Sequence, residues 1–229
     1  MCDLVIDLHL KSKKDKTNYS DLFELAIKKG SVSFISFLLK KNPPDLINYF
    51  PKIFTYHTYN TETIKMLANT FHSYLKKRKE FEKLSEKGKF SALFLASICE
   101  DYESLSLLEN IGVNIHQKND WDNHNILSMV SCFGSYKMFR YLVSEKNMDV
   151  SFVHPHLKMN LLHFSVHHGN FDVVRYILDR NLVNFVATVE GKSTNVFHLS
   201  ASRPLTKVKK KFTFFFKNLK KKKKKRAEI

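Results

Sequence analysis

The sequence predicts an all-α protein, an extended stack of helix–turn–helix units, and three observations support this fold class. A common pattern of apolar and turn residues recurs about every 35 residues. Within each copy the apolar side chains are three and four residues apart, as on one face of an α-helix. The chain of 229 residues contains only six Gly and five Pro, too few for the many turns of an all-β fold. We therefore expect a solenoid in which neighbouring units cover each other's apolar faces.

Two copies of the pattern precede residue 70. The first spans residues 21–39, with the small residue Ala26 in its first helix and Gly30 between the helices. Its second helix carries the apolar positions Phe34, Ile35, Leu38 and Leu39. A divergent copy spans residues 50–67, and its second-helix positions are Ile64, Met66 and Leu67. The stretch 76–89, in which Lys alternates with Glu, is interpreted as a solvated helix face or an insertion loop.

Three clearer copies and a truncated one follow in the same phase. They span residues 91–109, 125–143, 160–178 and 195–201. Glu100, Gly134 and Gly169 stand at the turn of the three full copies, 34 and 35 residues apart. A period kept through three copies, with the apolar positions aligned each time, is the sequence signature of a repeat array.

The segment 160–178 resembles the ankyrin repeat. It matches the family's pattern at Leu162, His163, Gly169, Val173, Val174, Ile177 and Leu178. It departs from that pattern at Asn160 and Leu161, where the family has Thr and Pro, although Asn160 can still cap the helix. The resemblance covers residues 20–203, with about five repeats and a truncated last one. A generic helical bundle is the alternative, and a tetratricopeptide array lacks its Trp/Gly/Tyr/Pro pattern here.

The resemblance implies roles for several structural residues. Gly30, Gly134 and Gly169 are expected between the paired helices with a positive φ, and Asn123 is expected to take that geometry in a finger loop. His163 and His198 are expected to hydrogen-bond backbone between units. The small residues Ala26, Ala96 and Ser165 should let the first helix approach its partner closely. The chain then divides into an N-terminal segment, 1–19, an ankyrin-repeat domain, 20–203, and a Lys/Phe-rich tail, 204–229.

Ankyrin repeats usually bind through finger tips and the exposed ends of first helices, so the resemblance implies a protein-interaction scaffold. The corresponding partner-binding positions are Trp121, Asp122, His124, Cys132, Phe133, His156, Leu157, Met159, His167 and His168. Trp121 and Phe133 are the expected anchors, because aromatic residues dominate binding hot spots. The alternative is that Trp121 folds onto the neighbouring finger and stabilises the stack. The histidines would make binding depend on pH between about 5 and 7.

The positive charge of the chain is concentrated in the tail. Residues 207–229 hold 11 Lys and Arg226 against one acid, Glu228, a net charge of +11, whereas the first 206 residues hold 26 basic and 21 acidic side chains. One interpretation is a disordered end or an artefact of the gene model. The other is a basic and aromatic anchor, Lys207–Arg226, for an acidic lipid surface or nucleic acid, or a nuclear import signal.

The sequence predicts no enzyme, cofactor or metal site. It contains no GxSxG, HExxH or complete phosphate-binding loop. His154, His156, His163, His167 and His168 lie close together in the sequence, but no Cys or carboxylate joins them at the spacing of a zinc site. Three scattered cysteines, no signal peptide and no apolar run long enough for a membrane span predict an intracellular protein, cytoplasmic or nuclear. The chain is expected to be a monomer.

Overall fold

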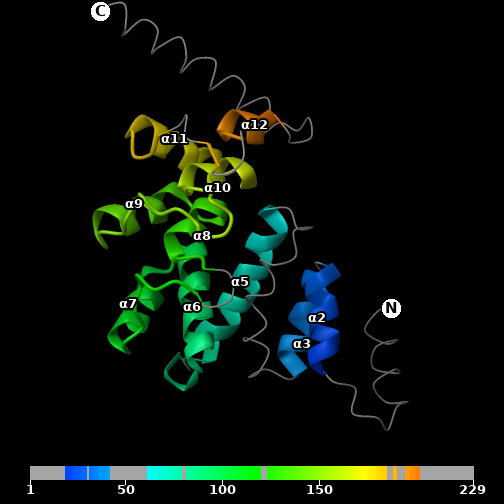
Figure 1. Cartoon of the computed structure of the whole chain (residues 1–229). Coiled ribbons are helices and arrows are strands. Elements are labelled where there is room, and N and C mark those ends of the chain that lie inside the picture. Colours follow the sequence, from blue (N-terminus) through cyan, green and yellow to red (C-terminus); the bar gives the residue numbers. More distant parts are fainter. Residues whose placement is uncertain are drawn as a thin grey trace, which may run out of the picture. The chain divides into compact units, whose positions relative to one another are not determined.

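The computed structural model describes residues 19–29, 31–41, 61–78, 81–119, 123–184, 188–189 and 194–201. The chain divides into two compact units, Met1–Lys79 and Glu80–Ile229. Regular secondary structure in the described part consists of α-helices (Figure 1) and a single-turn 3-10 helix. Two isolated β-bridges join loop residues. The all-α fold predicted from the sequence is confirmed. The limits of the repeat domain, 20 and 203, and the tail 204–229 stay predictions, and the tail lies outside the described residues.

In the described residues of the first unit, three helices surround an apolar core. They are α2 (Tyr19–Lys29), α3 (Val32–Lys41) and α5 (Thr61–Arg78). Between α2 and α3 the chain turns at Ser31, whose backbone N–H donates to the carbonyl oxygen of Ala26 at 3.1 Å. Phe23 of α2 meets Phe71 of α5 edge to face, with ring centroids 5.6 Å apart, and both side chains are fully buried. The apolar positions predicted at 35, 38 and 39 are buried as well.

Helix α5 corrects one sequence expectation. Ile64 and Leu67 are buried as predicted, but Met66, expected in an apolar position, is 55% exposed. The buried apolar positions of α5 are Ile64, Leu67, Ala68, Phe71 and Leu75. Their spacing of three and four places residue 66 on the opposite face of the helix. Residues 50–60 of the predicted copy lie outside the described part.

The second unit is a succession of helix pairs. Its elements are η2 (Phe81–Lys83), α6 (Glu86–Ile98), α7 (Tyr102–Asn110), α8 (Ile126–Phe133), α9 (Tyr136–Ser144), α10 (Leu161–His168), α11 (Phe171–Asp179) and α12 (Val196–Ala201). The first helices α6, α8, α10 and α12 pack in sequence against one another, and α7, α9 and α11 form a second row beside them (Figure 1). Each helix therefore buries its apolar face against the neighbouring unit, as expected for a repeat array.

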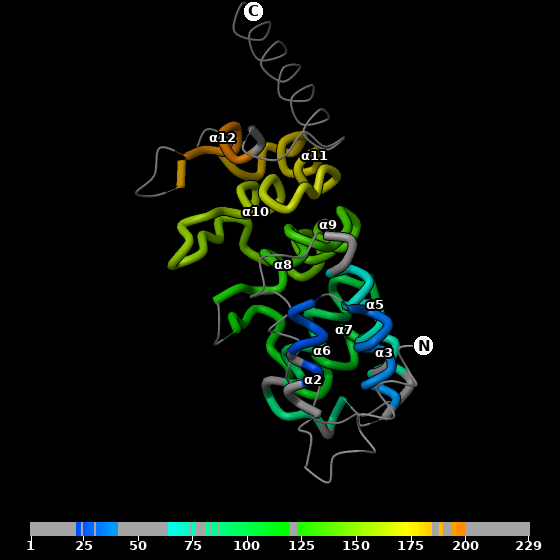
Figure 2. Tube along the Cα trace, turned by 90° about the vertical axis from the view of Figure 1, so that its right-hand side faces the viewer, coloured from blue at the N-terminus to red at the C-terminus, as the bar shows by residue number. Residues whose placement is uncertain are grey.

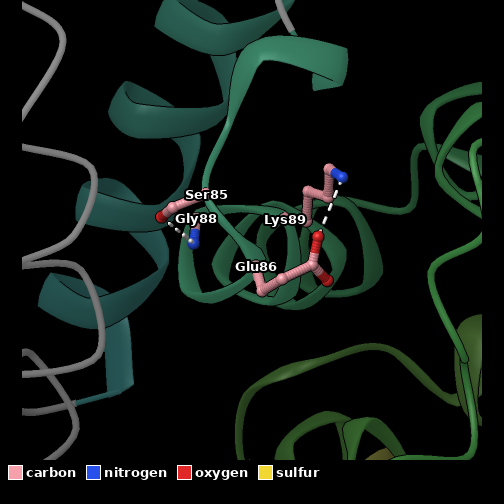
Figure 3. A network of polar contacts seen from close by, with 4 residues as sticks. All are labelled: Ser85, Glu86, Gly88 and Lys89. Atoms are coloured by element: carbon pink, nitrogen blue, oxygen red, sulfur yellow. Dashed lines mark hydrogen bonds and ion pairs between the residues drawn. The ribbon is translucent and has the colours of Figure 1, made fainter.

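Helix α6 begins earlier than the repeat pattern predicted. Its first residue is Glu86, five residues before the expected start, because Ser85 caps it: the backbone N–H of Gly88 donates to Ser85 Oγ at 3.2 Å. Lys89 Nζ bonds Glu86 Oε1 at 2.9 Å on the exposed side of the same turn (Figure 3). The end of the stretch 76–89 is thus a helical turn with a solvated face.

The next two first helices, α8 and α10, each begin with a reciprocal cap at an asparagine. The N–H of Ser128 donates to Asn125 Oδ1 at 2.8 Å, and the N–H of Asn125 donates to Ser128 Oγ at 3.2 Å. At the next copy His163 takes the place of Ser128: its N–H donates to Asn160 Oδ1 at 3.0 Å, and its Nδ1 accepts from the N–H of Asn160 at 3.3 Å. Asn160 therefore caps as predicted, and His163 contributes to its own unit's cap.

His198 repeats this arrangement at the start of α12. The N–H of His198 donates to Asn195 Oδ1 at 3.3 Å, and its Nδ1 accepts from the N–H of Asn195 at 3.2 Å. The three Asn caps at 125, 160 and 195 are spaced by one repeat, so the phase read from the sequence is the phase of the structure.

The turn between paired helices corrects another expectation. Gly169 has the predicted positive φ of 74°, and Glu100, at the same place in an earlier copy, has a φ of 57°. Gly134 instead has a φ of −83°, so it needs no left-handed geometry. A Cβ built on it would lie 2.6 Å from Val130 Cγ1, so close packing is what requires glycine there. Gly30 lies outside the described residues.

Asn170 joins two units. Its counterparts in earlier copies, Asp101 and Ser135, cap their own helices with side-chain oxygens. The side chain of Asn170 makes no such cap. Its Nδ2 donates to three carbonyl oxygens around the end of α8, those of Val130, Ser131 and Gly134 at 3.3, 3.2 and 2.8 Å. The amide thus supplies donors to carbonyl groups at the C-terminal end of the preceding unit's first helix, which have no partner within that helix.

Candidate interaction surface

The connections between units form equivalent finger loops. Figure 2 shows the connections after α7 and after α9 projecting to the same side of the second unit. In the first, the N–H of Asn119 donates to the carbonyl oxygen of His124 at 2.9 Å. In the second finger, the equivalent N–H belongs to His154, 35 residues after Asn119, and it donates to the carbonyl oxygen of Met159 at 2.9 Å. Asn123 has the predicted positive φ, 59°.

His154 holds the second finger in one conformation. Its side chain is only 3% exposed, and its Nδ1 accepts from the N–H groups of His156 and Leu157 at 3.2 and 3.1 Å. At the start of the same loop, Asp149 accepts from the N–H and hydroxyl of Ser151, both at 2.8 Å. These two hydrogen bonds lower the pKa of the Asp149 carboxyl. The finger is therefore held by side-chain acceptors together with the buried side chains of Met148 and Phe152.

Aromatic rings connect the bases of the two fingers. The rings of His124 and His154 lie 4.7 Å apart, and His124 also lies 4.9 Å from Phe164 of α10. His124 Nδ1 is 2.9 Å from Ser128 Oγ, in the cap of α8. His124 was predicted to contact a partner, and the structure places its half-buried ring in this stack between units. Its geometry positions the fingers relative to each other.

The remaining predicted partner-binding residues differ in exposure. His156, Leu157 and His167 are exposed, and Met159 and His168 are partly exposed. The rings of His167 and His168 lie 5.0 Å apart at the end of α10. Trp121 and Asp122 lie outside the described residues.

The exposure expected for Cys132 and Phe133 is wrong. They are 2% and 3% exposed, because α8 lies between α6 and α10 and every one of its residues is buried. Phe133 packs edge to face against His168, with centroids 4.6 Å apart. Neither side chain is available to a partner in this conformation, and the expectation that Phe133 is an anchor is withdrawn.

Sequence reasoning missed Val153. Its side chain is 50% exposed on the second finger, next to the buried Phe152 and His154. The bridge between Val153 and Asn160 shows that this part of the loop is extended. Alternation of buried and exposed side chains is the signal of an extended segment, and it could have identified Val153.

No group of three or more His, Cys, Asp or Glu side chains in the described part of the chain is arranged to hold a metal ion. None of the described helices combines the length and apolar character needed to cross a membrane.

Comparison with known proteins supports the assignment of the repeats. Residues 93–189 match the family model of ankyrin repeats, in three copies. No curated protein matches the chain. The matched segment contains α7 to α11 and both fingers, with their shared caps and turns. Ankyrin repeats are generally protein–protein interaction modules, and proteins built from them are typically scaffolds without catalytic activity. Residues 93–189 of the chain are therefore ankyrin repeats.

Proposed function

We propose that the protein is an interaction scaffold that binds another protein through its second finger and the end of α10. We call these residues the finger surface: Val153, His156, Leu157, Met159, His167 and His168. Trp121 and Asp122, which the sequence predicts at the tip of the preceding finger, are proposed to extend it. Five of these six residues were predicted from the sequence and are exposed or partly exposed. Val153 is added, and the buried Cys132 and Phe133 are left out.

The observation that carries the proposal is the exposure of two aliphatic side chains on an ordered finger. Val153 and Leu157 are 50% and 49% exposed, although the backbone around them is held by His154. Exposed aliphatic groups beside imidazoles provide apolar contact together with hydrogen-bonding groups, as at the centre of protein interfaces. Because the loop is already ordered, binding loses little conformational entropy.

A matched pair of variants tests the finger surface. A partner would be captured with the full chain and identified, and its affinity measured for Leu157→Asp and Leu25→Asp. The two leucines are equally exposed, 49% and 50%, but Leu25 lies on α2. We expect Leu157→Asp to weaken binding about tenfold or more, and Leu25→Asp to leave it unchanged. Equal affinities for the two variants would contradict the proposal.

Trp121→Ala distinguishes the two roles considered for that residue. As an anchor, Trp121 contributes to affinity, and its removal weakens binding while the melting temperature stays the same. If Trp121 instead stabilises the stack, its removal lowers the melting temperature and leaves the affinity unchanged. We propose the anchor role, and unchanged affinity with a lowered melting temperature would reject it.

A second candidate function concerns the tail. The net charge of +11 in residues 207–229 favours association with an acidic lipid surface or nucleic acid through Lys207–Arg226. Deletion of residues 207–229 is expected to abolish binding to anionic vesicles or to nucleic acid and to retain the protein partner. Vesicle and nucleic-acid binding that survives the deletion would reject this function for the tail.

A further inference from the structure

The row of second helices carries aromatic and apolar side chains at repeating positions. Their first residues are Tyr102, Tyr136 and Phe171, and five residues later in each helix stand Leu107, Tyr141 and Tyr176. All six are exposed or partly exposed. Tyr102 meets Tyr141 edge to face at 4.9 Å, and Tyr136 lies 6.5 Å from Tyr176. Apolar area therefore continues over α7, α9 and α11, the row of helices seen in Figure 1.

A surface depression of about 360 Å³ lies at α9 within this row. The residues that line it are Tyr136, Lys137, Arg140, Tyr141 and Glu145. Its size is at the lower end of the range for ligand sites, enough for one or two side chains. The lining combines two aromatic rings with two cations, and Tyr and Arg are the residue types enriched in binding hot spots.

The charges around the depression identify the chemistry that it fits. In the part of the chain that the structure describes, Lys137 and Arg140 are exposed and make no ion pair, whereas Lys146 pairs with Glu109 and Arg175 with Asp179. The depression therefore carries two cations that form no ion pair within the described residues, and one carboxylate, that of Glu145. Acids elsewhere in the row are Glu103, Glu109, Asp172 and Asp179. This mixture disfavours a polyanion such as nucleic acid or a lipid surface, and favours a single carboxylate flanked by apolar groups.

We propose that the depression is a second docking site, for an acidic linear segment of a partner protein. A Glu or Asp side chain of the segment would be held between Lys137 and Arg140, since guanidinium and ammonium groups bind carboxylates through charge-assisted hydrogen bonds. Apolar residues of the segment would lie on Tyr136 and Tyr141. The site is independent of the finger surface, because it uses the other row of helices.

Peptide selection with the full chain tests the proposal. A phage-displayed library of random dodecapeptides would first be depleted on the Lys137→Glu/Arg140→Glu variant, which keeps the tail and the fingers, and then selected on the unchanged protein. Peptides that bind elsewhere are removed in the first step. We expect the remaining pool to be enriched in peptides with Asp or Glu next to apolar residues. No enrichment, or enrichment of peptides without acids, would overturn the proposal.

The selected peptide then gives a quantitative control for net charge. Its affinity would be measured by fluorescence anisotropy for Lys137→Gln/Arg140→Gln and for Lys28→Gln/Lys40→Gln, whose exposed lysines lie on α2 and α3. Both variants lose the same charge, and circular dichroism checks that both are folded. We expect affinity to fall about tenfold or more for the first pair alone. An equal fall in both variants would show that long-range charge, not the depression, binds the peptide.

Discussion

Asn170 shows how one side chain can link two repeats. It stands where the earlier copies have a capping Asp or Ser, but its amide nitrogen serves the carbonyl groups of the preceding unit. An amide is suited to this role because it donates hydrogen bonds, which a carboxylate cannot do. In two copies the residue at this position caps its own helix, and in the third copy it bonds the preceding unit.

Replacement of Asn170 is expected to destabilise the second unit. Asn170→Ala removes the donor shared by three carbonyl groups and should lower the free energy of unfolding by about 1–3 kcal/mol. Asn170→Asp, which is similar in size but has no donor when ionised, should lower it at least as much. Chemical denaturation measures both, with Asn110→Ala at the exposed end of α7 as a control expected to change little. An Asn170→Asp protein as stable as the original would contradict this role.

Cys99 gives a prediction about pH. Burial, and to a lesser extent the nearby Asp101 carboxylate, raise the pKa of its thiol from about 9 to about 12. At pH 8 about one Cys99 thiol in ten thousand is then ionised, against about one in ten for an ordinary cysteine with a pKa near 9. Because only the thiolate reacts with iodoacetamide, labelling of Cys99 should be slow in the folded protein and fast in denaturant.

Mass spectrometry of the Cys99 peptide measures this difference. The raised pKa also makes the free energy of unfolding depend on pH. Between about pH 9 and 12 the unfolded chain loses the thiol proton and the folded chain keeps it. Rising pH therefore lowers the free energy of unfolding in this range. Equal labelling rates with and without denaturant at pH 8 would contradict a raised pKa of the Cys99 thiol in the folded protein.

The second finger depends on one buried acceptor. His154→Ala removes Nδ1, so the N–H groups of His156 and Leu157 should exchange faster with solvent, and stability should fall by about 1–3 kcal/mol. His154→Asn keeps an oxygen near the position of Nδ1 and should restore much of the protection. Hydrogen exchange measures both amides. His156→Ala, which removes an exposed ring, is the control. Unchanged exchange in His154→Ala would contradict the account of the finger.

The sequence predicted the elements of the second unit well for a physical reason. Each full repeat has its own cap, turn and apolar stripe, and these depend on neighbours in the chain, as the Asn160 cap shows. The start of α6 at Glu86 was missed because the Ser85 cap precedes the repeat pattern. Met66 was placed wrongly because the copy at 50–67 is too divergent to fix the helix phase.

Properties that depend on packing between units were less accessible from the sequence. The consensus marked residues 132 and 133 as variable, but α8 is enclosed on both sides, which no local pattern shows. Gly134 was explained by backbone geometry, whereas contact with Val130 requires it. The stack of His124 on His154 and Phe164 joins residues from successive repeats, so spacing alone could not reveal it.

At the scale of the whole molecule, the second unit separates two tasks. The first helices and their packed interfaces give stability, and the fingers and the row of second helices carry the exposed groups proposed to bind partners. Stability in such an array is approximately a sum over units and their interfaces. In such an array a residue of one unit and its counterpart one period later occupy equivalent structural positions, so whole periods can be removed without disturbing the packing of the remaining units.

Deletion of one whole period tests this equivalence most directly. Asn125 and Asn160 are equivalent caps 35 residues apart, so removal of Ile126–Asn160 joins Asn125 to Leu161 and keeps the phase. Removal of residues 126–155 deletes 30 residues instead of 35 and therefore breaks the phase. We expect the in-phase deletion to keep its helix content per residue and to unfold cooperatively in thermal circular dichroism, and the out-of-phase deletion to lose both. Equal loss of structure in the two proteins would contradict the repeat architecture described here.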